Sequence, residues 1–122
     1  MKGKVNGQRE AIVRLRIEGS RKKRITVAGI IDTGYDGMLT LPKKIIRSLK
    51  LPPVGQNEAE LANGQVVSFD TYEAVVHWSG RKLRIGVDEA QTDPLIGMGL
   101  LDGFELMVQV KPRGKVTIAK LQ

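Results

Sequence analysis

A single Asp-Thr-Gly tripeptide, Asp32-Thr33-Gly34, follows directly on the apolar run Val27–Ile31. A strand that leads straight into this tripeptide places the Asp32 carboxylate on a tight, rigid turn, unlike an ordinary surface acid that moves freely in solvent. A carboxylate held in this way can act as a general acid or base toward water or a reacting oxygen. The tripeptide is therefore the first candidate for chemistry in the chain.

Two further features follow the tripeptide in a fixed order. Asn63-Gly64 separates two β-rich segments, and this dipeptide between alternating residues is a strong signal for a β-hairpin. Further along, Leu95-Ile96-Gly97 runs into Met98–Leu101, a segment that predicts a short helical turn. The hairpin lies about midway between the two glycine-containing motifs.

This ordered set resembles the retropepsin family of aspartic proteases, and most closely the small bacterial and archaeal retropepsin-like proteins. The resemblance covers roughly residues 25–104. It implies a mainly β fold: a closed or nearly closed β-barrel of the retropepsin-like acid protease type with one or two short helices. Residues 1–122 would form a single domain that is one half of a dimeric enzyme.

The resemblance also implies a function, that of a homodimeric aspartic endopeptidase acting on a peptide or protein substrate. Because the chain has one Asp-Thr-Gly, the catalytic pair would be Asp32 from each of two chains related by a two-fold axis. Thr33 would hydrogen-bond across that axis. Gly34 would let the backbone bend sharply and leave room for the substrate main chain.

Six further residues are expected to bind substrate or shape its site. Asn63 and Gly64 would form the tip of a flap, and Gly97 would lie beneath the active-site turn, where a Cβ would push the turn away. Tyr35 is bulkier than the residue that usually follows Asp-Thr-Gly and would narrow a pocket. The expected set is Tyr35, Asp36, Asn63, Gly64, Ile96 and Gly97.

The elements that must position these residues are mostly strands. Apolar residues at every second position from Ala11 to Ile17 predict a half-buried strand. Pro42–Lys50 has one apolar face and predicts a helix, with Pro42 at its first position. Further strands are expected over residues 25–31, 38–41, 58–61, 65–78, 82–87, 104–110 and 116–121.

Composition limits the chemistry. The 122 residues include no cysteine and one histidine, His77, which cannot build a metal site alone, so we expect no metal and no cofactor. No apolar stretch reaches the roughly 20 residues that span a bilayer, and the start lacks the apolar core of a secretory signal. We therefore expect no membrane partner and a cytoplasmic location.

Two alternatives to the protease remain. The same fold could serve as a catalytically silent peptide-binding or scaffold dimer, because a fold alone does not establish activity. The net charge of +7 also permits a small basic β-barrel that binds nucleic acid. The densest basic run, Arg21–Arg24, is better explained as a solvated turn, and aromatic residues are scarce, so nucleic acid is the less favoured partner.

Overall fold

The computed structural model describes residues 1–122 and is built mainly from strands, which hold 54% of the residues, against 11% in helices. In chain order the elements are β1 (Lys2–Val5), β2 (Ala11–Glu18), the short 3₁₀ helix η1 (Ser20–Lys22), β3 (Arg24–Ile31), β4 (Leu39–Leu41), α1 (Lys43–Leu49), β5 (Pro53–Glu60), β6 (Val66–Trp78), β7 (Arg81–Glu89), β8 (Leu95–Ile96), α2 (Met98–Leu101), β9 (Phe104–Val108) and β10 (Lys115–Lys120).

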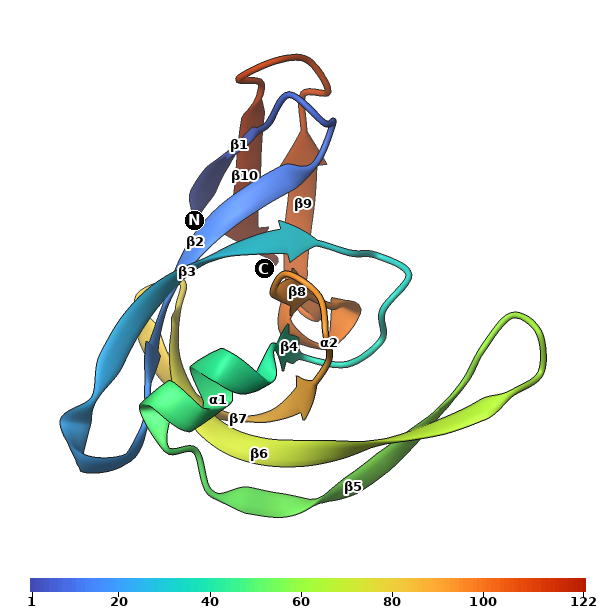
Figure 1. Cartoon of the computed structure of the whole chain (residues 1–122). Coiled ribbons are helices and arrows are strands. Elements are labelled where there is room, and N and C mark those ends of the chain that lie inside the picture. The colour runs from blue at the N-terminus through green and yellow to red at the C-terminus, as the bar shows by residue number, and fades with distance from the viewer.

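Six strands form a closed ring of backbone hydrogen bonds. The ring runs β2–β3–β8–β4–β7–β6 and returns to β2 because β6 also pairs with β2 (Figure 1). Most neighbours are antiparallel, but β8 is parallel to β3, and β4 is parallel to β7. The mainly β, closed architecture predicted from the sequence is therefore confirmed.

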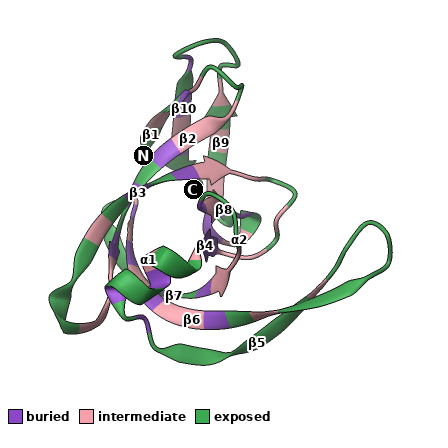
Figure 2. Ribbon diagram, in the orientation of Figure 1, coloured by how far each residue is buried: buried purple, intermediate pink, exposed green.

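The core fills the inside of this ring. Period two on β2 sends Val13, Leu15 and Ile17 inward, where each is at most 1% exposed, and leaves Arg14 and Arg16 outside. Helix α1 closes one opening with Ile46 and Leu49, both buried. Figure 2 shows the resulting contrast between buried stretches on the ring strands and exposed residues elsewhere.

The helix and strand boundaries refine the sequence expectations. Helix α1 begins at Lys43, so Pro42 is its extended N-cap residue rather than its first helical residue. Strand β5 begins at Pro53, well before the expected Glu58, because the segment after the prolines pairs with β6. Strand β1 was not expected and pairs with both β2 and β10.

Two parts extend from the ring. The β5–β6 hairpin forms a long arm that reaches away from the other strands, and β1, β10 and β9 continue the sheet beyond β2 (Figure 1). Nearly all of β5 is exposed, so the arm has solvent on both faces within one chain. None of the helices is both long enough and apolar enough to span a lipid bilayer.

Candidate active site

Asp32 lies immediately beyond the end of β3, on a turn that the ring holds in place. Its backbone N–H donates to the carbonyl of Ile96 on β8 at 2.9 Å, which continues the parallel pairing of the two strands. The N–H of Gly34 donates to Asp32 Oδ1 at 2.9 Å, so the half-buried carboxylate has a fixed direction. The structure thus presents one oriented carboxylate at the rim of the ring.

The segment from Gly97 to Gly99 supports the rest of this loop from behind. Gly97, Met98 and Gly99 each donate a backbone hydrogen bond to the loop, with N···O distances of 2.8–3.0 Å. A Cβ on Gly97 would lie 2.2 Å from the Gly37 carbonyl oxygen and 2.5 Å from a ring carbon of Tyr35. Only glycine allows this approach, because such contacts are far inside van der Waals separation.

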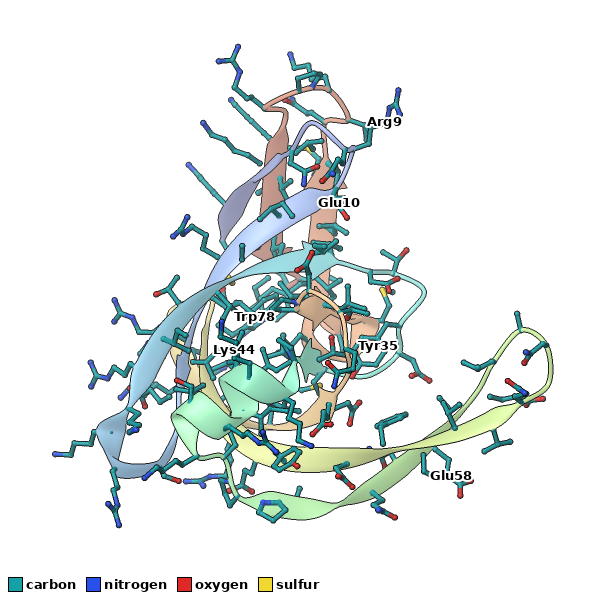
Figure 3. The ribbon with its side chains drawn as sticks, viewed as in Figure 1. Arg9, Glu10, Tyr35, Lys44, Glu58 and Trp78 are labelled. Atoms are coloured by element: carbon teal, nitrogen blue, oxygen red, sulfur yellow. The ribbon has the colours of Figure 1, made fainter.

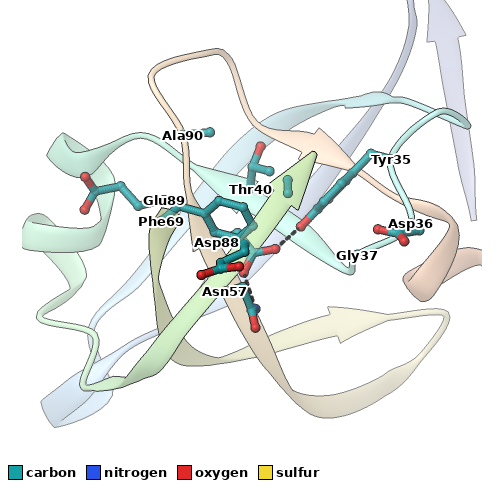
Figure 4. A pocket seen from close by; sticks show the side chains of 11 residues that line it. Tyr35, Asp36, Gly37, Thr40, Asn57, Phe69, Asp88, Glu89 and Ala90 are labelled. Atoms are coloured by element: carbon teal, nitrogen blue, oxygen red, sulfur yellow. Dashed lines mark hydrogen bonds between the residues drawn. The ribbon is translucent and has the colours of Figure 1, made fainter. Parts of the chain in front are cut away.

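Tyr35 links the loop to the opposite side of the ring. Its hydroxyl donates to Asp88 Oδ2 on β7 at 2.5 Å (Figure 4). The other oxygen of Asp88 accepts from Thr71 Oγ1 on β6 at 3.0 Å and from Asn57 Nδ2 on β5 at 3.2 Å. Burial of the phenol and its bond to Asp88 raise the pKa of Tyr35 well above the usual value, so the hydroxyl remains a donor.

A cavity of about 300 Å³ opens beside this network, between the loop and the base of the hairpin arm (Figure 4). Tyr35 and Phe69 supply its aromatic walls. Asp36 and Gly37 contribute from the loop, and Asp88 contributes from β7. A cavity of this size, lined in part by the loop that follows Asp32, can receive a side chain of a bound molecule.

The other expected site residues lie in different settings. Thr33 and Gly34 are exposed, and the Thr33 hydroxyl makes no hydrogen bond within the chain. Gly34 does not have a positive φ, and its Cβ would meet only Asp32 Oδ1, at 3.3 Å, so the turn itself does not require glycine. Ile96 is fully buried, and its carbonyl, rather than its side chain, supports the turn of Asp32.

Asn63 and Gly64 lie at the exposed tip of the hairpin arm, which reaches away from the loop between β3 and β4 (Figure 1). The Gly64 N–H donates to the Leu61 carbonyl at 2.9 Å. Within this turn, Gly64 is the one residue with a positive φ, which is 85°. This is a type I turn with a glycine bulge, because a type I′ turn would also need a positive φ at Asn63. The predicted hairpin is confirmed.

Sequence reasoning missed Asp88, Thr71 and Asn57. Asp88 falls just after the expected strand 82–87, and its hydrogen bond to Tyr35 joins residues 53 positions apart. The only available signal was an acid at the end of an apolar-alternating strand, which does not identify a partner. The side-by-side register of Thr71 and Asp88 becomes visible only once β6 and β7 are paired.

Comparisons with solved structures support the fold. No protein-family model matches the sequence, and no curated protein matches it. Among solved structures, a retropepsin-like aspartic protease from Rickettsia conorii aligns with a TM-score of 0.59 at 14% identity, covering 98% of this chain and 91% of that one.

Two viral enzymes align as well. The EIAV protease, solved with the inhibitor HBY-793, gives a TM-score of 0.58 at 17% identity and covers 80% of this chain and 89% of its own. The protease of simian foamy virus (mac) gives 0.51 at 15% identity, covering 74% of this chain and 92% of its own. These similarities show the fold: the chain has the retropepsin-like aspartic protease fold, as its sequence predicted.

Proposed function

We propose that the chain is one subunit of a homodimeric aspartic endopeptidase whose catalytic dyad is Asp32 of the two subunits. The observation that carries this proposal is the Asp32 turn. Its carboxylate is oriented by the Gly34 N–H, and its loop is supported by Gly97 within a retropepsin-like fold. One chain supplies one such carboxylate, so an isologous dimer completes the pair.

The chemistry needs both carboxylates in different protonation states. Two acids a few Å apart cannot both ionise, so the pair holds one proton, and aspartic proteases are the standard example of this behaviour. The ionised carboxylate takes a proton from a water molecule as the water oxygen attacks the peptide carbonyl carbon. The protonated carboxyl gives its proton to the carbonyl oxygen. Because the two carboxyl groups titrate together, their apparent pKa values belong to the pair and not to either residue.

In this proposal the β5–β6 hairpin arm is the flap that closes over an extended peptide. Its base contains a register shift between Pro53 and Gly55, a feature that lets paired strands bend. Exposed apolar residues near its tip, Leu61 and Val66, would lose contact with water on closure. The cavity beside Tyr35 would then receive one substrate side chain.

The test compares two variants with the same chemical change. Asp32→Asn should abolish cleavage of an unfolded protein substrate while the dimer persists in sedimentation analysis, because only the dyad is lost. Asp93→Asn, at an exposed loop position away from the turn, should keep wild-type activity. Wild-type activity should have an acid-side pH optimum and be sensitive to statine-type inhibitors.

The same pair of variants decides between the protease and the silent scaffold. Cleavage that persists in Asp32→Asn would refute the dyad. Absence of cleavage in the wild type, together with unchanged peptide binding in Asp32→Asn, would instead support a binding module with this fold.

A further inference from the structure

Five basic side chains share the outer face of one continuous sheet, on the adjacent strands β10, β1 and β2. They are Lys2, Lys4, Arg14, Arg16 and Lys115, and all are exposed. Residues directly opposite each other, or two apart on one strand, point to the same side of a sheet. The registers Lys4↔Lys115 and Lys4↔Ile12 therefore place these five cations on one side. We call them the cationic face.

None of the five cations of the cationic face has a carboxylate within ion-pair distance. Elsewhere on the same side of the sheet, Glu18 forms ion pairs with Arg24 and Lys82 and a hydrogen bond with His77. The remaining ion pair joins Arg84 to Glu73. No ion pair reaches any of the five cations, although the other basic groups of this sheet side are satisfied.

One pair on the cationic face is unfavourable in the free protein. Lys4 and Lys115 lie directly opposite each other on β1 and β10. Like charges at this position destabilise paired strands. The repulsion would be relieved if an anion bound between the two side chains.

The surface among three of the five cations is hollowed. A depression of about 460 Å³ is lined by Lys2, Lys4 and Arg14 around Gly3, Ile12 and Ala28. Ala28 keeps the floor low because its side chain is small, and Gly3 contributes only backbone, since a Cβ there would point toward the Ile12 carbonyl and the buried Val13. The hollow therefore presents three cations around a floor that an extended ligand can approach closely.

We propose that the cationic face binds the phosphate backbone of nucleic acid. Cations distributed over three neighbouring strands match a ligand with many regularly repeated charges rather than a single anion. The face carries no aromatic side chain, so it contacts phosphates and does not stack or read bases. A membrane surface is a poorer match, because Met107 at the sheet edge is its single exposed large apolar residue.

The cationic face and the cavity beside Tyr35 lie on different sides of the ring. Nitrogen-tipped side chains extend outward along β1, β2 and β3, whereas Tyr35 lies on the opposite side of the ring (Figure 3). The proposal does not depend on the proposed protease activity. It does not involve the Arg21–Arg24 run, which remains a solvated turn.

The experiment measures binding of a fluorescently labelled 20-bp DNA duplex by anisotropy at several salt concentrations. Five phosphate contacts predict a log–log slope of roughly −4.5, so affinity should fall roughly several hundred-fold between 50 and 200 mM salt. The triple variant Lys2→Gln, Lys4→Gln, Lys115→Gln should reduce the magnitude of the slope by roughly 2.7.

The matched control removes the same number of charges elsewhere. The control is a second triple variant that alters three exposed cations at the η1 turn, namely Arg21→Gln, Lys22→Gln and Lys23→Gln. It should leave the salt slope unchanged. Equal losses in the two triple variants would mean that net charge alone drives binding, and this would overturn the proposal. So would the absence of salt-dependent DNA binding, or binding to phosphatidylserine vesicles in preference to the duplex.

Discussion

Replacement of Gly97 by alanine perturbs the Asp32 loop from behind. The new Cβ would lie 2.2 Å from the Gly37 carbonyl oxygen and 2.8 Å from that of Tyr35. Non-bonded heavy atoms pack at roughly 3.5 Å, so the loop must retreat by about 1 Å. Overpacking of this kind costs about 1–3 kcal/mol of folding stability. A 1 Å displacement of a catalytic group can lower turnover by about 10²-fold.

Thermal unfolding and peptide cleavage, both at one protein concentration, measure these two effects. We expect the melting temperature of Gly97→Ala to fall by about 4–12 °C and its turnover by about 10²-fold. Gly86→Ala on β7 is the control, because its Cβ would meet only Thr71 Cγ2, at an ordinary 3.4 Å. A Gly97→Ala protein that melts and cleaves as the wild type does would refute the support assigned to this glycine.

Two further predictions concern polar networks. Asp88→Ala leaves the hydroxyls of Tyr35 and Thr71 without the carboxylate that accepts their hydrogen bonds, so urea unfolding should show a loss of about 2 kcal/mol or more in the free energy of unfolding. Tyr35→Phe should lower the free energy of unfolding by about 1 kcal/mol. Equal stability of Asp88→Ala and the wild type would contradict the network. The hydrogen bond from His77, aided by Lys82 and Arg24, lowers the pKa of Glu18 below its usual 4.5. The folded state then binds this proton less readily than the unfolded state, so the stabilisation is complete above about pH 4.5 and is lost as pH falls through the lowered value. Melting curves of Glu18→Gln should therefore depend less on pH between about 5 and 3 than those of the wild type, and parallel pH profiles would exclude this contribution.

Local patterns in the sequence predicted much of the fold because those patterns reflect burial. Alternation from Ala11 to Ile17 became β2, since one face of that strand lies in the core. Asn63-Gly64 marked a real hairpin because glycine adopts at little steric cost the positive φ that the turn requires at Gly64. Asp32 could be proposed as the catalytic residue because its tripeptide and the downstream glycine motif are both short and local.

Long-range features could not be predicted in the same way. Strand β8 has two residues, and a parallel pair of that length leaves no periodic trace. Strand β1, Lys2–Val5, contains lysines and glycine and is stabilised by neighbours on both sides rather than by its own pattern. The contact between Tyr35 and Asp88 depends on the closed ring, which brings β7 to the Asp32 loop.

The decisive measurement for the proposed dyad is the separation between the Asp32 carboxylates of two subunits in a crystal structure of the dimer. If the two carboxylates form the dyad, their nearest oxygen atoms lie within hydrogen-bond distance, at about 2.5–3.0 Å, and share one proton. A monomer, or a dimer in which Asp32 and Asp32 of the partner subunit lie too far apart to share a proton, would contradict the proposed dyad.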